Sequence, residues 1–199
     1  SGLLSSRLKS QAALDEESDY QFGRITDAAQ RMRTMIADIM RLSQINSVSL
    51  HPTLFPLKEA LNEACEQLFL TIEENNATIN LLNEESIVFA DKSLITLLLQ
   101  NLIANAIKFK REQPPIIDIS VQNLETSTIL TIGDNGIGIA AEFWQQIFEP
   151  FRRLNPSHTH PGSGIGLALC RQICIAQDGN IRCVSEVGDG TKIIIELPK

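Results

Sequence analysis

The segment at residues 97–110, L-L-L-Q-N-L-I-A-N-A-I-K-F-K, combines the pattern of a buried helix with a row of polar side chains. Positions four and seven residues apart share one face of an α-helix, so Asn101, Asn105 and Lys108 fall within a narrow arc. The opposite face is apolar and carries Leu99, Leu102, Ile103 and Ala106. Amide oxygens are suitable Mg²⁺ ligands, and a lysine can meet phosphate oxygens as a point charge. The segment therefore predicts a polar row that either binds a ligand or simply faces solvent.

A second segment, D-N-G-I-G-I at residues 134–139, follows the strand-like stretch T-I-L-T-I-G. Gly136 and Gly138 would let the backbone turn sharply and approach a ligand closely. A carboxylate at the end of a buried strand is costly unless it is paired, and the exocyclic amine of adenine would pair with Asp134. Taken alone, D-N-G is equally a common turn.

Two further glycine-containing segments follow. In G-S-G-I-G-L-A-L, residues 162–169, the free amides at the start of a predicted helix would bind phosphate, and Gly164 and Gly166 would permit close approach. This segment is neither a Walker A loop nor a Rossmann fingerprint. The segment G-D-G-T, residues 188–191, lies between two predicted strands and by itself indicates a hairpin turn.

The rest of the chain after residue 52 alternates between short strand patterns and helical patterns. Strands paired as hairpins beside separate helices indicate an α+β fold, a two-layer sandwich of a mixed sheet and helices. We expect strands at 53–57, 78–83 paired with 87–89, a hairpin over 116–132 with its turn near 123–126, and a final hairpin of 181–185 with 192–197. We expect helices at 58–74, 92–110, 142–147 and 165–177.

The N-terminal part predicts a long helix with a narrow apolar seam. Apolar residues recur every seven positions, with Ile25, Met32 and Ile39 in one row and Ala28, Met35 and Leu42 in the other. Such a seam is typical of a coiled coil or four-helix bundle, so we expect a partner helix. The sequence thus divides into a helical region, residues 1–48, and an α+β domain, residues 49–199.

Composition excludes several classes of function. The 199 residues carry a formal net charge of −7, which disfavours nucleic acid as a partner. Four cysteines lack zinc-site spacing, and Cys170 and Cys174 fit a buried helix face. No apolar run is long enough to cross a membrane, so we expect a cytoplasmic bacterial protein whose larger parent could carry a membrane anchor.

Each segment alone is a weak indication of function, but their order along the chain indicates one protein family. Asn…Asn…Lys, D-x-G-x-G, F-E-P-F, G-x-G-x-G-L and G-x-G-T follow one another between about residues 53 and 198. This order resembles the catalytic domain of histidine kinases, within the ATPase superfamily shared with gyrase, a heat-shock chaperone and mismatch-repair proteins. The resemblance implies the Bergerat-type ATP-binding fold, with ATP and Mg²⁺ as cofactors.

The resemblance also implies roles for individual residues. Asn105 would coordinate Mg²⁺ with Asn101 as a possible second ligand, and Lys108 would contact the phosphates. Arg152 or Arg153 could reach the γ-phosphate or a partner helix, and we do not choose between them. Asp134 would accept a hydrogen bond from the adenine amine, and Thr191 would assist it, commonly through water. The remaining implied nucleotide-binding residues are Phe109, Gly136, Gly138, Ile139, Phe148, Phe151, Gly162, Ser163, Gly164, Ile165, Gly166 and Leu167.

The implied activity is transfer of the γ-phosphoryl group of Mg·ATP to a histidine, and then to an aspartate of a response regulator. Residues 14–45 are similar to the second helix of the dimerisation and phosphotransfer region of phytochrome-like kinases, which implies a homodimer. The expected histidine followed by an acidic residue is absent, and His51, which abuts a proline, does not fit. We therefore expect the phosphoacceptor to lie upstream of Ser1.

Two alternatives remain open. Hydrolytic ATPases of the superfamily place a glutamate four residues before the magnesium asparagine, but here that position is Asn101, and an amide cannot act as a general base. The other alternative is an ATP-binding regulatory or scaffold module without kinase activity.

Overall fold

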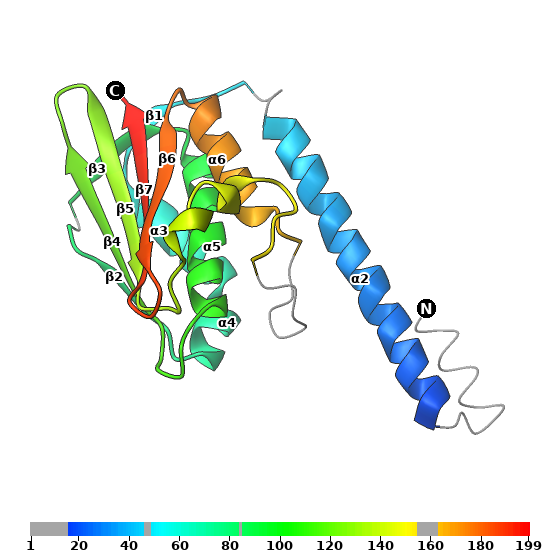
Figure 1. Ribbon diagram of the computed structural model, residues 1–199. Helices are drawn as coiled ribbons and strands as arrows, with labels where there is room; N and C mark the ends of the chain where they lie inside the picture. The colour runs from blue at the N-terminus through cyan, green and yellow to red at the C-terminus, as the bar shows by residue number, and fades with distance from the viewer. Residues whose placement is uncertain (1–15, 46–48, 84, 155–162) are drawn as a thin grey trace.

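The computed structural model describes residues 16–45, 49–83, 85–154 and 163–199. Within them, a five-stranded sheet is covered on one face by helices, and one long helix runs along the outside (Figure 1). The helices are α2 (Glu16–Ile45), α3 (Leu57–Gln67), α4 (Phe69–Glu74), α5 (Lys92–Lys108) and α6 (Gly166–Ala176). Two 3₁₀ turns are η1 (Ala141–Phe143) and η2 (Gln146–Phe148). The strands are β1 (Thr53–Pro56), β2 (Thr78–Leu81), β3 (Ile87–Ala90), β4 (Ile116–Asn123), β5 (Ser127–Asp134), β6 (Asn180–Glu186) and β7 (Gly190–Pro198).

The main sheet is mixed, and its strand order is β2-β4-β5-β7-β6. β2 runs parallel to β4, and the other neighbours are antiparallel. The α+β sandwich predicted from the sequence is therefore confirmed, as are the β4–β5 and β6–β7 hairpins. The register places Thr191 of β7 opposite both Asp134 of β5 and Ser185 of β6, so these three side chains share one face of the sheet.

α5 is the central helix because most of its side chains are apolar and its start is fixed by a polar cap. The Asp91 carboxylate accepts hydrogen bonds from the backbone N–H groups of Ser93 and Leu94, which would otherwise lack partners at the helix start. Leu98 and Leu99 are fully buried and belong to the hydrophobic core that helices and strands share. The helix ends at Lys108, so the polar row at 101, 105 and 108 lies in its second half.

The cysteines of α6 belong to the core, as the sequence predicted. Cys170 and Cys174 are buried free thiols. Burial raises the pKa of the Cys174 thiol to about 12, so it stays protonated and unreactive at neutral pH.

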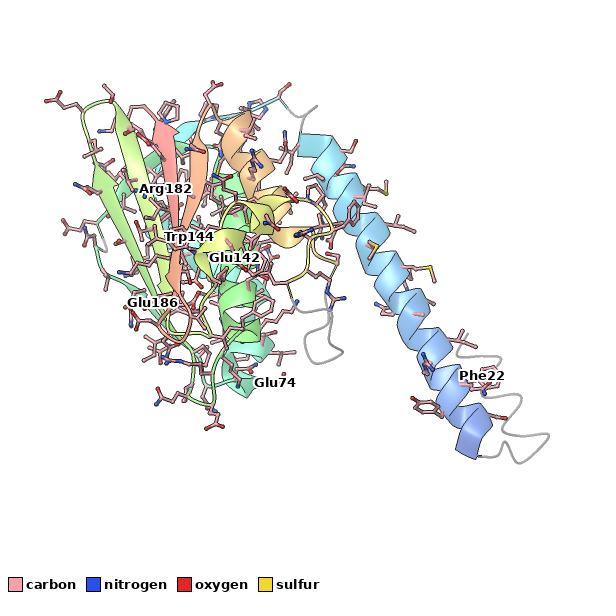
Figure 2. All side chains as sticks on the ribbon, viewed as in Figure 1. Phe22, Glu74, Glu142, Trp144, Arg182 and Glu186 are labelled. Atoms are coloured by element: carbon pink, nitrogen blue, oxygen red, sulfur yellow. The ribbon has the colours of Figure 1, made fainter. Side chains whose placement is uncertain are left out.

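α2 contacts α6 near its C-terminal end, where Ile45 is buried and Leu42 packs against the core (Figure 1). The two rows of the predicted seam have different surroundings: Ala28, Met35 and Leu42 are half-buried, whereas Ile25, Met32 and Ile39 are exposed. Phe22 lies towards the far end of α2, away from the sheet (Figure 2). No helix among the described residues combines the length and the apolar character that a membrane crossing requires.

Three expectations about secondary structure are wrong. The helix expected at 58–74 is interrupted at Leu68, because the buried stripe of α3 does not continue and α4 buries no residue. The strands expected to pair at 78–83 and 87–89 do not meet, since β2 pairs with β4 and β3 pairs with β1. The helix expected at 142–147 consists of the two 3₁₀ turns η1 and η2.

Candidate functional site

A cavity of about 380 Å³ opens between the second half of α5, the adjoining ends of β5 and β7, and the start of α6. It brings together most of the residues that the sequence singled out. Those that line it are Asn101, Asn105, Lys108, Phe109, Asp134, Gly138, Ile139, Arg152, Arg153, Ser163, Gly164, Gly166, Leu167 and Thr191. Segments that are far apart in the chain therefore meet around one space.

Asp134 marks one end of this cavity, at the end of β5. Its Oδ1 accepts hydrogen bonds from the backbone N–H of Gly136 at 2.8 Å and of Thr191 at 3.2 Å. Burial raises the pKa of the Asp134 carboxyl, and the two backbone hydrogen bonds partly oppose that rise by stabilising the ionised form. Both bonds go to Oδ1, so the geometry leaves Oδ2 as the oxygen that can accept from a ligand.

The glycines around Asp134 are required by close backbone contacts. A Cβ on Gly190 would lie 1.9 Å from the Asp134 carbonyl oxygen, and a Cβ on Gly138 would lie 1.9 Å from that of Glu186. Both glycines also have positive φ, +88° and +72°, which disfavours any side chain. A Cβ on Gly136 would come within 2.7 Å of the Phe109 carbonyl oxygen, so this glycine lets the turn after β5 pack on the end of α5.

Arg111 connects the loops that enclose this end, although sequence reasoning did not single it out. Its Nε donates to the Asn135 carbonyl oxygen at 2.8 Å, and its Nη1 donates to that of Gly188 at 2.6 Å. Gly188 in turn donates its N–H to Ile137. The turn after β5 and the β6–β7 turn, which Glu186 marks in Figure 2, are thus tied to each other and to the end of α5.

The polar row of α5 lines the cavity from Asn101 to Lys108, and its Asn101 end meets the start of α6. Asn101 donates its side-chain N–H to the Leu97 carbonyl at 2.8 Å, so its amide oxygen remains directed away from its own helix. A Cβ on Gly166 would lie 3.0 Å from this oxygen, so the start of α6 approaches α5 closely here. The Lys108 ammonium lies over the Phe109 ring, 4.8 Å from its centre. Burial, followed by the neighbouring Arg153 charge, lowers the pKa of Lys108.

The loop before α6 closes this end and touches α2. The Gly164 carbonyl accepts from the Phe151 N–H at 3.0 Å, and Gly164 has a φ of +74°. The Ser163 hydroxyl donates to the Asp38 carboxylate of α2 at 2.6 Å and accepts from the Ile165 N–H at 3.3 Å. The long helix therefore places a carboxylate in the wall of the cavity, next to the glycine loop and within the same cavity as Lys108, Arg152 and Arg153.

Comparison with known proteins identifies the family. Residues 90–199, more than half of the chain, match the family described as histidine kinase-, DNA gyrase B- and HSP90-like ATPase. The chain belongs to this family. The matched region contains the second half of α5, β5, the glycine loop and the β6–β7 hairpin, which are the elements that build the cavity.

Relatives of this histidine kinase-like ATPase domain include a phytochrome and a histidine kinase. Cyanobacterial phytochrome A of Nostoc sp. is 33% identical over 191 residues, which cover 96% of this chain and 25% of that protein. The catalytic domain of the histidine kinase ThkA is 29% identical, with a TM-score of 0.63 over 75% of this chain and 96% of that one. ThkA in complex with the response regulator TrrA gives a TM-score of 0.71 at 26% identity, covering 100% of this chain and 56% of that one. The chain spans about a quarter of the length of the curated relative that it matches.

Some predicted residues of the ATPase domain do not line the cavity. Gly136 and Ile165 are not among its lining residues, and Ile165 is fully buried. Phe148 is buried in the core, whereas Phe151 is 54% exposed, so the two do not form an equivalent pair. Gly162 lies outside the described residues, as do His158 and His160.

Other lining residues were missed by sequence reasoning. They are Asp38, Leu102, Ala106, Ile132, Ile137, Ile147, Leu154 and Ile193. The alternation of strands could have found two of them, because Ile132 lies two residues before Asp134 and Ile193 two residues after Thr191, on the same face. No local signal marks Asp38, because only the docking of α2 brings it to the cavity.

The donor set of this ATPase domain suits a Mg²⁺ ion that is shared with a ligand. Two amide groups, those of Asn101 and Asn105, line the cavity, and Mg²⁺ characteristically takes one or two protein oxygens while waters and phosphates complete its octahedron. No group of three or more His, Cys, Asp or Glu side chains among the described residues could hold a metal by itself. The residues therefore fit magnesium that arrives with a phosphate ligand better than a permanently bound metal.

Proposed function

We propose that this chain binds Mg·ATP and is the catalytic part of a sensor histidine kinase. One observation carries the proposal: Asn105, Asp134 and Gly164, which come from three separate segments, line the same cavity. The cavity offers a half-buried carboxylate, and it also offers amides, cations and a helix start. Adenine and the phosphates of ATP need these complementary surroundings at their two ends.

At the base end, Asp134 accepts from the adenine amine, and Thr191 lies beside it on the neighbouring strand. The apolar side chains of Ile132, Ile137 and Ile193 line the cavity and exclude water from the base. A hydrogen bond to an ionised acceptor in such surroundings contributes more than a neutral one. The base end therefore supplies orientation as well as affinity.

At the phosphate end, Asn105 and Asn101 are the residues that would hold Mg²⁺, which neutralises phosphate charge when bound. Lys108 and one of Arg152 and Arg153 add positive charge, and the backbone amides at the start of α6 face the phosphates. Phosphoryl transfer depends mainly on such positioning and charge neutralisation. Asn101 stands where a hydrolytic relative carries a glutamate, which favours transfer over hydrolysis.

In the proposed reaction, a histidine nitrogen outside this chain attacks the γ-phosphorus. The N–P bond forms while the bond between the γ-phosphorus and the β,γ-bridging oxygen breaks, and ADP leaves. The phosphoryl group then passes to an aspartate of a response regulator, a partner that the related kinase ThkA has in its complex with TrrA.

The exposed row Ile25, Met32 and Ile39 of α2 supports homodimerisation in the parent protein. Free thiols at all four cysteines agree with a cytoplasmic location.

Nucleotide binding is tested by calorimetry with Mg·ATP on the 199-residue chain. We expect Asp134→Asn to lower the affinity by about tenfold to a hundredfold, because the amide presents a weaker acceptor to the adenine amine. Asp178→Asn makes the same chemical change on an exposed turn with a φ of 55°, where asparagine is well tolerated, and should leave the affinity unchanged. Equal affinity of the wild type and the Asp134 variant would refute the site.

Phosphotransfer is tested with ATP labelled on its γ-phosphate. We expect negligible self-labelling of the chain, and labelling of a separately supplied dimerisation and phosphotransfer region from a phytochrome-like kinase. The label should be stable to alkali and labile to acid, as a phosphohistidine is. Efficient labelling of the chain alone would contradict the assignment of the acceptor, and rapid ADP release without any labelled protein would favour a hydrolytic ATPase.

A further inference from the structure

Three polar side chains form a row across the strands at the base end of the cavity. Asp134 of β5 stands opposite Thr191 of β7, and Thr191 stands opposite Ser185 of β6. β7 lies between β5 and β6 in the sheet (Figure 1). Asp134 and Thr191 line the cavity, whereas Ser185 does not. Ser185 can therefore influence a ligand only through its neighbours.

The Ser185 hydroxyl has one proton to donate and two lone pairs that can accept, and its neighbours use all three. Its single hydroxyl proton goes to the Gly190 carbonyl oxygen, 2.6 Å from Oγ, because a carbonyl can only accept. Its Oγ accepts from the backbone N–H of Ile139 at 2.8 Å. One lone pair remains, and the Thr191 hydroxyl oxygen lies 3.1 Å from it. Thr191 must therefore be the donor in this contact.

This assignment fixes which way the Thr191 hydroxyl points. Its proton is directed at Ser185, so only the lone pairs of its Oγ1 are left for the cavity. Beside it, the Asp134 carboxylate also accepts only, as any ionised carboxylate does. The two polar groups from neighbouring strands thus present acceptors and no side-chain proton to a ligand.

We propose that Ser185 sets the base specificity of the cavity by holding the Thr191 hydroxyl as an acceptor. This inference rests on the proposed nucleotide-binding function. An exocyclic amine has two protons and satisfies both acceptors, directly or through a bridging water. A carbonyl at the same position of the base, as in hypoxanthine or guanine, has none and faces two acceptors, which leaves buried polar groups unpaired. Ser185 is a positioning residue, since it acts through Thr191.

Replacement of Ser185 by alanine releases the Thr191 proton. The hydroxyl can then rotate and donate to a carbonyl on the base, so the penalty against that carbonyl falls. A purely structural role for Ser185 predicts something different, namely equal weakening of every nucleotide. The ratio of affinities for an amine-bearing and a carbonyl-bearing base separates these two roles.

The experiment measures ADP and inosine diphosphate (IDP) binding by calorimetry in Mg²⁺, with the 199-residue wild type and its variants. IDP differs from ADP in carrying a carbonyl in place of the adenine amine, together with an N–H in place of the lone pair on the adjoining ring nitrogen. We expect the wild type to prefer ADP by at least about tenfold, and Ser185→Ala to reduce that preference by about fivefold to tenfold. Ser185→Thr keeps the hydroxyl and should keep the preference within about twofold. Thr191→Val should lose ADP affinity without gaining IDP affinity.

The outcomes are distinct. A folded Ser185→Ala variant with the wild-type preference, or with equally weakened ADP and IDP binding, overturns the role of Ser185. A wild type that binds ADP and IDP equally also overturns it but leaves the nucleotide site intact, whereas a wild type that binds neither refutes the proposed function itself. If thermal unfolding shows that Ser185→Ala is not folded, Ser185→Cys replaces it in the experiment. The cysteine sulfur keeps the side-chain volume and is a weak acceptor. Its preference should then fall between those of the wild type and Thr191→Val.

Discussion

The two ends of the cavity are built in different ways. Asp134, Thr191 and the glycines of the base end belong to adjacent strands of one sheet or to the turns between them, and backbone hydrogen bonds fix their spacing. The phosphate end is assembled from α5, residues 152–154, the loop before α6 and α2, and side chains such as Ser163 and Asp38 connect these parts. The base end is therefore one rigid unit, and the phosphate end depends on how separate units dock.

This difference predicts how each end responds to change. Substitutions at the base end should act on folding and on base recognition together, because the same backbone bonds serve both. Substitutions of the polar side chains at the phosphate end should alter nucleotide affinity with little effect on stability, because side chains such as Asn105, Lys108 and Arg152 line the cavity and are not fully buried.

The largest effect should follow from placing a side chain at Gly190, where the Asp134 backbone leaves no room for one. Gly190→Ala would place a Cβ 1.9 Å from the Asp134 carbonyl oxygen at a φ of +88°, so we expect a loss of at least about 3 kcal/mol in the free energy of unfolding. Gly188→Ala is the matched control, because Gly188 has a φ of +90° but nothing lies within 4 Å of its Cβ position. It should cost only the backbone strain, about 1–2 kcal/mol. Urea unfolding measures the free energy of unfolding of both variants. Equal losses would show that the backbone beside Gly190 has room for a side chain and that the base end is not tightly packed.

The next effect concerns the phosphate end. Lys108→Gln should weaken ATP binding by about tenfold, because a partly buried cation is lost from the phosphate surroundings. Adenosine binding should change by less than about twofold, since adenosine has no phosphates. Stability should stay near the wild-type value. A loss shared equally by ATP and adenosine would mean that the two ends do not act separately.

A smaller effect should appear at the contact between α2 and the glycine loop. The Asp38 carboxylate lies in the wall that the proposed phosphates occupy, so Asp38→Asn should raise ATP affinity by about threefold at low salt. The gain should shrink at high salt, where screening weakens the repulsion. Asp178→Asn, on the exposed turn after α6, is the control. Unchanged or weaker ATP binding in the Asp38 variant would show that the contact supports the site instead of opposing the nucleotide.

The smallest effect is on the stability of the ligand-free protein. Burial raises the folded-state pKa of Asp134, so the folded protein binds a proton here more readily than the unfolded chain, and this group destabilises the fold above that pKa. Asp134→Asn should therefore raise the midpoint of thermal unfolding by about 1–3 °C at neutral pH. The difference should shrink as the pH falls through the folded pKa and vanish below the unfolded pKa, where the carboxyl is neutral in both states. A lower midpoint at neutral pH would show that the two backbone hydrogen bonds outweigh the cost of burial.

Sequence reasoning found much of the site because its residues sit in short local patterns. The row Asn101, Asn105 and Lys108 follows from helical spacing, and both glycine-rich turns follow from residue type. It failed where the answer depended on pairing partners, and it also failed for the helices expected at 58–74 and 142–147. The strand at 78–83 could have joined any neighbour by its composition, and it joined β4 across a long connection. Phe148 and Phe151 look equivalent in the chain, but one is buried and the other exposed.

The sequence alone determined the local conformations: where helices begin, which turns need glycine, and which faces are apolar. These depend on neighbours within a few positions, where backbone sterics and side-chain periodicity act. Only the tertiary structure decided that the hydroxyls of Ser185 and Thr191 meet, that Arg111 ties two turns together, and that Asp38 of α2 reaches the glycine loop. These contacts join residues through the packing of whole strands and helices, and no pattern along the chain encodes the distance between two such surfaces.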